Sequence, residues 1–430
     1  MTRLSEEETT VRVSLLRLSI ALMFVLTYIG IRPVSVRAEE ATIDEMGTPE
    51  FPSQIKRKLP KPKEEIGLKL GPFRLHPSFQ SSVEYDDNIL LSSNGEKDDV
   101  LFTQFPGIGA QVKMGDHRAE FGYGAEFINF VDQAEENSVN HFAHGLMELV
   151  FDNLSLELSH GFEDATGRLF SETSIRDEVM VNSSQALLRY DRPRWAAELG
   201  WRHNDIDHRV AALDASDYEE DVLALLGGYK VLHKILVLVE VDVGDVHYDQ
   251  NTANADQQYY QVWTGLKGDF SRKLSTALKV GYQNRQMGDL PGGRKDYGSS
   301  VAEIDLLWKP RDSSAIRSAY TRTVRPSTFS ANNWYQQDKV SLSLRQRFLR
   351  KWYITPLVSW QRNRYPEVSL LNGEAKERRD DFWVGELELR YQIKDWLSTG
   401  LAYRYRERGS NYDSLEFTNN RVSFDVKFVY

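Results

Sequence analysis

The sequence predicts an all-β fold: a transmembrane, antiparallel up-and-down β-barrel of about 18 strands, within a range of about 16 to 20. Long stretches of the chain alternate apolar and polar residues, the pattern of a strand with one apolar and one polar face. Short turn signals recur at intervals of roughly 40 residues, with longer polar stretches between them. The last residues, 422–430, alternate throughout and end on an aromatic side chain.

Composition agrees with a barrel wall. The chain has 430 residues, is 41% hydrophobic and has a mean hydropathy of -0.49. Helical membrane spans need about 20 consecutive apolar residues, whereas barrel strands face lipid on one side only and keep the average hydropathy low. The net charge of -10 argues against a nucleic-acid partner, because the phosphate backbone requires a basic surface. The chain has no cysteine, so we expect no disulfide, thiolate metal site or lipoprotein anchor.

The N-terminal residues have the pattern of an export signal. Arg12 and Arg17 precede an apolar run over residues 18–31, and Val36 and Ala38 occupy the two positions that define a cleavage site. We therefore expect a signal peptide over residues 1–38; an uncleaved anchor helix is the alternative. Residues 39–71 contain several prolines and clustered charges, which predicts a flexible periplasmic segment.

Each repeat of roughly 40 residues predicts two long strands, joined by a tight turn at one end and a longer loop at the other. The repeats predict a barrel over residues 72–430, with about nine hairpins and both termini in the periplasm. A propeller blade, which has a similar period, would need four short strands where this sequence has room for two long ones. The tight turns are expected at Gly115-Asp116, Asp152-Asn153, Asp191-Arg192-Pro193, His233-Lys234, Ser271-Arg272, Arg311-Asp312, Arg350-Lys351 and Lys394-Asp395, and the loops at 133–137, 167–173, 207–217, 249–255, 288–295, 326–333, 366–376 and 409–413.

The charged face of each strand should point away from lipid, because a charged side chain at the bilayer midplane costs about 2 to 4 kcal/mol. Three prolines lie inside predicted strands. Proline has no backbone N–H to donate to the hydrogen-bond ladder of a sheet, so we expect bulges or strand ends at Pro77, Pro106 and Pro356. Aromatic residues should form two interface girdles, one near the turns (Phe151, Trp195, Trp308, Trp352, Trp396) and one near the loops (Tyr85, Phe130, Tyr248, Trp334, Trp360).

Two segments resemble a known family. The stretch Gly71-Pro-Phe-Arg-Leu-His-Pro77, followed by Val83-Glu-Tyr-Asp-Asp-Asn-Ile89, resembles the opening of the outer-membrane β-barrel porins often found beside exopolysaccharide biosynthesis genes. Phe428 and Tyr430 resemble the C-terminal signal that such barrels present to their assembly machinery, although Phe or Trp is commoner at the last position. The resemblance covers residues 71–430 and implies an outer-membrane channel, with polysaccharide export as one role.

Charged residues on the inferred inner faces are the candidates for lining a pore. Rings of basic side chains favour anions, so an arginine-rich wall would select an anionic solute or acidic sugar polymer. The alternative is that these charges pair across neighbouring strands and fill a wet interior. The candidates are Glu120, Glu126, Glu157 and Glu198 in the N-terminal half, and Arg285, Arg317, Arg345, Arg347, Glu386, Glu388, Arg390, Arg404 and Arg406 in the C-terminal half.

Evidence for a metal, a cofactor or catalysis is weak. Asp86, Asp87 and Asn88, with Asp98-Asp99 on the next strand, offer oxygen ligands for Ca²⁺, but acidic loops are common. His203 and His208 flank two carboxylates at a strand end, where a solvated strand end is the simpler interpretation. The sequence has no Gly-x-Ser-x-Gly or His-Glu-x-x-His motif, and we expect no enzyme and no cofactor.

Together these observations predict an outer-membrane channel of a Gram-negative-type bacterium, for passive diffusion or export of polar solutes, with saccharides as one cargo class. The alternatives are a plugged or structural barrel in an envelope or polysaccharide assembly, or an outer-membrane enzyme. A plug should be a loop longer than about 20 residues, and none is evident. The expected partners are outer-membrane lipid, the barrel-assembly machinery and polysaccharide export components.

Overall fold

The computed structural model describes residues 67–168, 172, 174–250, 254–288, 296–328, 332 and 334–430. The predicted signal peptide and most of the predicted periplasmic segment lie outside these residues. Strand β1 (Leu68–Leu70) pairs with the start of β2 (Phe73–Asp86), so ordered pairing begins before the boundary at residue 71 expected from the sequence.

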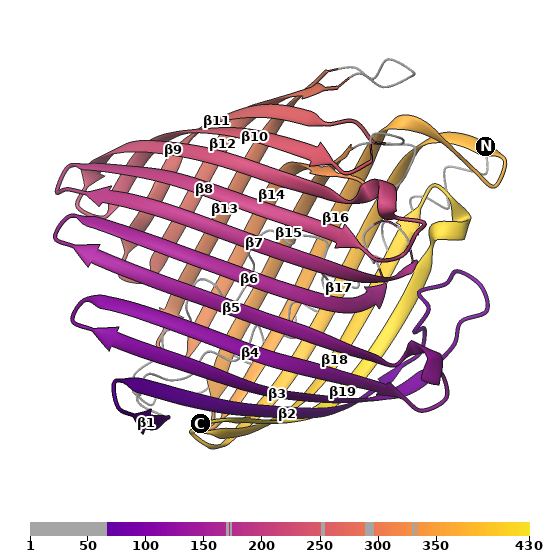
Figure 1. The fold of residues 1–430 in the computed structure, drawn as a ribbon. Coiled ribbons are helices and arrows are strands. Elements are labelled where there is room, and N and C mark those ends of the chain that lie inside the picture. Colours follow the sequence, from indigo (N-terminus) through magenta and orange to yellow (C-terminus); the bar gives the residue numbers. More distant parts are fainter. Residues whose placement is uncertain are drawn as a thin grey trace. The chain divides into compact units, whose positions relative to one another are not determined.

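Among the described residues, β2 to β19 form a closed antiparallel barrel of 18 strands in chain order (Figure 1). The barrel closes between its first and last strands, where Phe424 pairs with Val83 and Phe428 with Phe79. The predicted fold class and strand number are therefore confirmed. The remaining strands are β3 (Asp99–Met114), β4 (His117–Phe130), β5 (Ser138–Phe151), β6 (Leu154–Arg168), β7 (Arg176–Asp191), β8 (Trp195–His208), β9 (Tyr218–Leu232), β10 (Ile235–Tyr248), β11 (Gln257–Ser271), β12 (Leu274–Met287), β13 (Tyr297–Arg311), β14 (Ser314–Pro326), β15 (Trp334–Phe348), β16 (Trp352–Leu371), β17 (Glu374–Lys394), β18 (Leu397–Ser410) and β19 (Phe417–Val429).

No helix among the described residues is long and apolar enough to cross a membrane. In the part of the chain that the structure describes, three short 3-10 helices lie in the longer connections: η2 (Ala134–Glu136), η3 (Asp214–Ser216) and η4 (Asp413–Leu415).

The short turns lie at one end of the barrel, at the left of Figure 1, and occur where the sequence predicts them. The C-terminus lies at this same end, because the N–H of Val429 donates to the carbonyl of Trp396 beside the β17–β18 turn (2.9 Å). One predicted loop is wrong. Residues 366–376 belong mostly to β16 and β17, which continue to a tight turn at Asn372 and Gly373, both with positive φ (51° and 83°). Asn-Gly is the strongest signal for such a two-residue hairpin, and it outweighs the polar composition around it.

The three prolines lie inside strands instead of ending them. Pro77 pairs in register with Ile108, and its carbonyl accepts the N–H of Tyr430 (3.0 Å). At Pro106 the ladder to β4 is interrupted and resumes without a register shift, and at Pro356 the same happens in the ladder to β15. The expectation of bulges at Pro106 and Pro356 is therefore wrong. The strand pairing continues past each proline although its backbone has no N–H to donate, and neither strand carries an extra residue there.

Large exposed apolar side chains identify the outer face of the wall. Val422, Phe424 and Val426 are exposed on alternate positions of β19, as the sequence pattern predicts. Of the aromatic residues predicted for the girdle near the turns, Phe151, Trp195, Trp308 and Trp396 are exposed and Trp352 is half-buried. The girdle near the loops is only partly as expected: Tyr85 is exposed, but Tyr248 and Trp334 are buried. Tyr248 packs with Tyr218, and Trp334 is covered by Tyr297.

Candidate pore lining and outer mouth

The acidic candidates of the N-terminal half all contact a polar partner. Glu157 pairs with Arg189 on the neighbouring strand (3.0 Å), and Glu198 pairs with Lys267 (2.7 Å). Glu126 is buried and accepts a hydrogen bond from Asn140 Nδ2 (2.9 Å). Glu120 lies 3.6 Å from Arg118, and Gln111 donates to it at 3.3 Å.

Four candidates on β17 and β18 form ion pairs within the last three strands: Glu386, Glu388, Arg390 and Arg404. Arg404 pairs with Glu386 (2.6 Å). Arg390 contacts both Glu388 (2.6 Å) and Asp425 on β19 (3.0 Å), bridging positions two strands apart. These side chains alternate with the exposed apolar residues Leu387 and Leu401, so they lie on the face of the sheet opposite the apolar one.

The other basic candidates have more varied partners. Arg317 Nε donates to Asp305 Oδ2 (2.9 Å). Arg285 is 2% exposed; it donates to Gln257 Oε1 (2.5 Å), and its guanidinium lies 4.5 Å from the Tyr259 ring centre. Arg406 donates twice to Asn419 Oδ1 (2.9 and 2.6 Å), and the Arg345 guanidinium lies over Tyr353 (5.1 Å). Arg347 contributes a backbone bond to Ser313 (2.8 Å).

Acidic and basic residues are thus mixed around the wall. Arg118 and Arg189 accompany the acids of the N-terminal half, and Asp305, Asp425 and Glu386 accompany the arginines of the C-terminal half. Ion pairs across strands, one of the two interpretations of the sequence, account for six of these side chains: Glu157, Glu198, Arg317, Glu386, Arg390 and Arg404. A role for them in selecting a solute stays a proposal.

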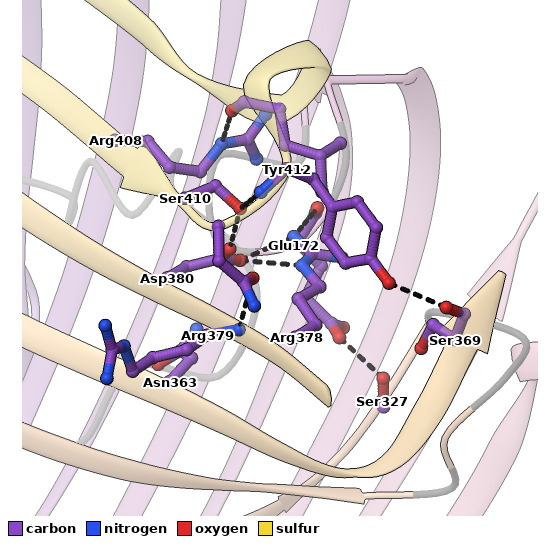
Figure 2. Close-up of polar contacts among 12 residues, drawn as sticks. Glu172, Ser327, Asn363, Ser369, Arg378, Arg379, Asp380, Arg408, Ser410 and Tyr412 are labelled. Carbon is purple, nitrogen blue, oxygen red and sulfur yellow. Dashed lines mark hydrogen bonds and ion pairs between the residues drawn. The ribbon is translucent and has the colours of Figure 1, made fainter. Parts of the chain in front are cut away.

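The connection between β6 and β7 contacts a distant part of the wall (Figure 2). Glu172 is 4% exposed, and its carboxylate accepts three hydrogen bonds from the segment that follows β14: from Ser327 Oγ (2.6 Å), Thr328 N (2.7 Å) and Thr328 Oγ1 (2.8 Å). The carbonyl of Glu172 accepts a bond from Arg378 on β17. Glu172 lies between β6 and β7, and Ser327 lies between β14 and β15. Going around the barrel wall from β7 to β14, six strands, β8 to β13, lie between the two connections, so these contacts join distant parts of the loop end.

Arg378 and Asp380 form a fully buried ion pair beneath these contacts. Their side chains are both 0% exposed, and Arg378 Nη2 lies 2.6 Å from Asp380 Oδ2. Asp380 also accepts the Ser410 hydroxyl (2.7 Å), and the Arg378 guanidinium lies 4.7 Å from the Tyr365 ring centre. Figure 2 shows this pair between Ser410 and Glu172. A charge pair removed from water is stable only when further polar groups satisfy it, which Ser410 does here.

Arg408 and Tyr412 complete a polar network at the loop end of the barrel, which we call the outer-mouth network because the sequence predicts that this end faces outward. It consists of Glu172, Ser174, Ser327, Thr328, Tyr365, Arg378, Asp380, Arg408, Ser410 and Tyr412. Arg408 is 2% exposed; it donates to the carbonyl of Leu415 and to Ser174 Oγ (3.1 Å). The Tyr412 hydroxyl donates to the carbonyl of Ser369 (2.6 Å). The network joins β6–β7, β14–β15, β16, β17 and β18 near their loop ends.

Buried apolar and aromatic side chains add a second packed region. It comprises residues of β7 to β11 near the loop end, namely Val181, Ile206, Tyr218, Val222, Val246, Tyr248 and Tyr259. The Tyr259 hydroxyl donates to Glu220 (2.8 Å), so this region also carries polar contacts.

The acidic residues considered for calcium are engaged by the protein. Asp99 accepts backbone N–H groups of Asp132 and Gln133 (3.1 and 2.8 Å). Asp86 pairs with Arg421 (2.7 Å), and Asp87 accepts from Asn420 (2.7 Å). The described residues contain no group of three or more His, Cys, Asp or Glu residues arranged to hold a metal.

The histidines considered for chemistry are dispersed. His203 contacts Asp221 (3.2 Å), whereas His208 contacts Asp177 (2.5 Å) as a fully buried pair. The two imidazoles therefore have separate partners on opposite neighbouring strands and do not form one site.

The outer-mouth network was missed by sequence reasoning. Arg408 continues the alternation of Arg404 and Arg406 and could have been included on that ground. The sequence predicts a loop over residues 366–376, so the alternation of β17 beyond that loop, which includes Arg378 and Asp380, gives no signal of a strand. No local signal distinguishes Glu172 from other acidic loop residues, since its partners are distant in sequence.

Comparisons with known proteins identify the family. Residues 202–430, more than half of the chain, match the model of a family described as "Putative beta-barrel porin 2". A search of curated proteins finds no match. Similar solved structures include the outer membrane protein opdK from Pseudomonas aeruginosa (8% identity, TM-score 0.47, covering 83% of this chain and 99% of that one) and the siderophore receptor PirA from Pseudomonas aeruginosa (9%, 0.43, 83% and 80%). A bacterial polysaccharide outer membrane secretin is also similar (12%, 0.35, 82% and 98%). With TM-scores below 0.5, these similarities carry no argument about function.

Proposed function

Because the chain belongs to this family of β-barrel porins, we propose that it is an outer-membrane channel for polar solutes, with anionic saccharides as the favoured cargo. The observation that supports this most is the two-faced wall: exposed apolar side chains alternate with charged and amide side chains around a closed sheet. Barrels of about 16 to 18 strands are wide enough to hold an aqueous channel. A polar inner face would let water and hydrophilic solutes enter it.

The preference for anions rests on the chemistry of the basic side chains. Arg285 hydrogen-bonds to an amide and stacks on a tyrosine, contacts that hold the guanidinium in place without cancelling its charge. Positive charge in a narrow, poorly hydrated passage attracts anions more strongly than the same charge in bulk water.

We further propose that both termini lie in the periplasm and that the C-terminal residues are read by the barrel-assembly machinery. Phe428 and Tyr430 stack with ring centres 6.4 Å apart at the short-turn end, and Tyr430 is exposed. Alternating aromatic residues on one face would suit an edge-to-edge encounter with another strand. Polysaccharide export components remain the proposed periplasmic partners.

Liposome swelling with the refolded mature protein tests the cargo class. Vesicles in isotonic glucuronate should swell faster than vesicles in isotonic glucose, once counter-ion flux is matched with a permeant cation. Equal rates for the two sugars would contradict anion preference. Swelling no faster than in protein-free vesicles, with insertion confirmed, would contradict the channel itself.

The second candidate is a barrel that is closed at rest and opened by a partner in an envelope or polysaccharide assembly. The contacts of Glu172 with Ser327, Thr328 and Arg378 favour it, because they connect separate parts of the wall at the loop end. We propose no enzymatic role for either form.

A further inference from the structure

The carboxylate of Glu172 is held in a way that resembles ligand binding. Its two oxygens receive two hydroxyl donors and one backbone N–H, at 2.6, 2.7 and 2.8 Å, and all three come from Ser327 and Thr328. Hydrogen bonds to a carboxylate are stronger than those between neutral groups, and a set of three fixes its orientation. The donors belong to the β14–β15 connection, whereas the carboxylate belongs to the β6–β7 connection.

We propose that Ser327 and Thr328 form a carboxylate-binding site at the outer mouth, that Glu172 occupies it as a tethered ligand, and that the carboxylate of an acidic sugar displaces Glu172. This proposal rests on the proposed channel function, because the displacing group must reach the mouth. It assigns the cargo class, uronate-type saccharides, to named donors.

Charge balance within the outer-mouth network supports the exchange. The network holds two guanidiniums, Arg378 and Arg408, and two carboxylates, Asp380 and Glu172, and each of these side chains is 4% exposed or less. If Glu172 leaves, the network keeps one unmatched positive charge in a buried place, which is unfavourable. A carboxylate that arrives from a solute restores the balance, whereas a neutral sugar does not.

The other described contacts of this connection are single hydrogen bonds. Arg378 donates to the carbonyl of Glu172, and Arg168 donates to the carbonyl of Ser174 (3.1 Å). The Ser174 hydroxyl accepts from Arg408 (3.1 Å) and donates to the carbonyl of Leu91 (2.8 Å). Among the described residues, the Glu172 carboxylate, which accepts three hydrogen bonds, is therefore the largest single attachment of the connection.

Binding of sodium glucuronate to the refolded mature protein in detergent micelles, measured by titration calorimetry, tests the site. If Glu172 fills the site more than about nine-tenths of the time, removing it should tighten glucuronate binding at least about tenfold. We expect this gain in E172A and a smaller one in E172Q, whose amide is a poorer acceptor. Glu135, an exposed acid in η2, provides the matched control: E135A should bind as the wild type does.

The donors Ser327 and Thr328 are tested in the E172A variant, in which the site is no longer filled by Glu172. Adding S327A and T328V to E172A should abolish the tenfold gain, and glucose should bind no variant more tightly than the wild type. Heat-modifiable gel migration verifies that each variant is folded. Glucuronate binding to folded E172A that is no tighter than to the wild type would overturn the proposal, as would a gain that survives in the triple variant.

Channel recordings on the same proteins separate this proposal from the proposed function. Conductance in the wild type with no change of glucuronate affinity in E172A would leave the channel standing and reject the carboxylate site. Tighter glucuronate binding to E172A with no conductance in any variant would support the site and reject the channel.

Discussion

Replacing Asp380 with alanine should destabilise the barrel far more than breaking an ion pair of similar geometry elsewhere on the same strand. Asp380 and Arg378 are both 0% exposed, and the carboxylate accepts Arg378 Nε (2.8 Å), Arg378 Nη2 (2.6 Å) and Ser410 Oγ (2.7 Å). In D380A the guanidinium stays buried without its carboxylate. Loss of one partner from a buried pair costs about 3 to 5 kcal/mol.

The matched comparison is the pair of Glu386 and Arg404, which has the same 2.6 Å contact but is 28% and 44% exposed. Water can solvate Arg404 in E386A, so that change should cost less than about 1 kcal/mol. Equilibrium urea unfolding in phospholipid vesicles, followed by tryptophan fluorescence, measures both free energies. The double variant R378M/D380A should recover part of the loss, because it removes the buried charge. Equal costs for D380A and E386A would refute this reasoning about burial.

Three further predictions concern the wall, a hairpin and a loop. The substitution F424R, on the exposed apolar face, should lower the free energy of unfolding by about 2 to 4 kcal/mol. The substitution S423R, at the adjacent position on the opposite face, should lower it by less than half as much in the same urea assay. Replacing Gly373, whose φ is +83°, with valine should cost about 1 to 2 kcal/mol, since a side chain strains the left-handed conformation; a loss below the error of unfolding measurements would contradict the tight turn. Burial raises the pKa of Asp217, just outside β9, from its ordinary 3.8 to about 6. Because the folded state then binds more protons, the wild type should lose stability relative to D217N as the pH rises from about 4 to 7, and parallel melting temperatures over that range would disprove the shift.

The repeating part of the fold could be predicted from the sequence because its causes are local. Alternation over residues 422–430 reflects the two environments of one strand, and turn signals such as Gly115-Asp116 mark chain reversals wherever the strands go next. Closure of β19 on β2 followed from the need to satisfy every backbone group in a bilayer. The Asn372–Gly373 turn carried an equally local signal, which the surrounding polar residues obscured.

The outer-mouth network could not be predicted because its contacts join residues far apart in the chain. Glu172 contacts Ser327 and Arg378, which lie 155 and 206 positions further along the chain. The burial of Tyr248 has a similar origin, since its partner Tyr218 lies on the neighbouring strand and both rings pack into the same region. The alternation of apolar and polar residues predicts which face of the sheet a side chain lies on, but it does not predict which other side chains will contact it.

The central claim is that this barrel is a channel, and single-channel recording of the refolded mature protein in a planar bilayer tests it most directly. With a salt gradient across the bilayer, we predict discrete conductance steps and a reversal potential of the sign that indicates anion preference. Steps with cation preference would contradict the assigned cargo class. Insertion without any conductance step would contradict an open channel at rest.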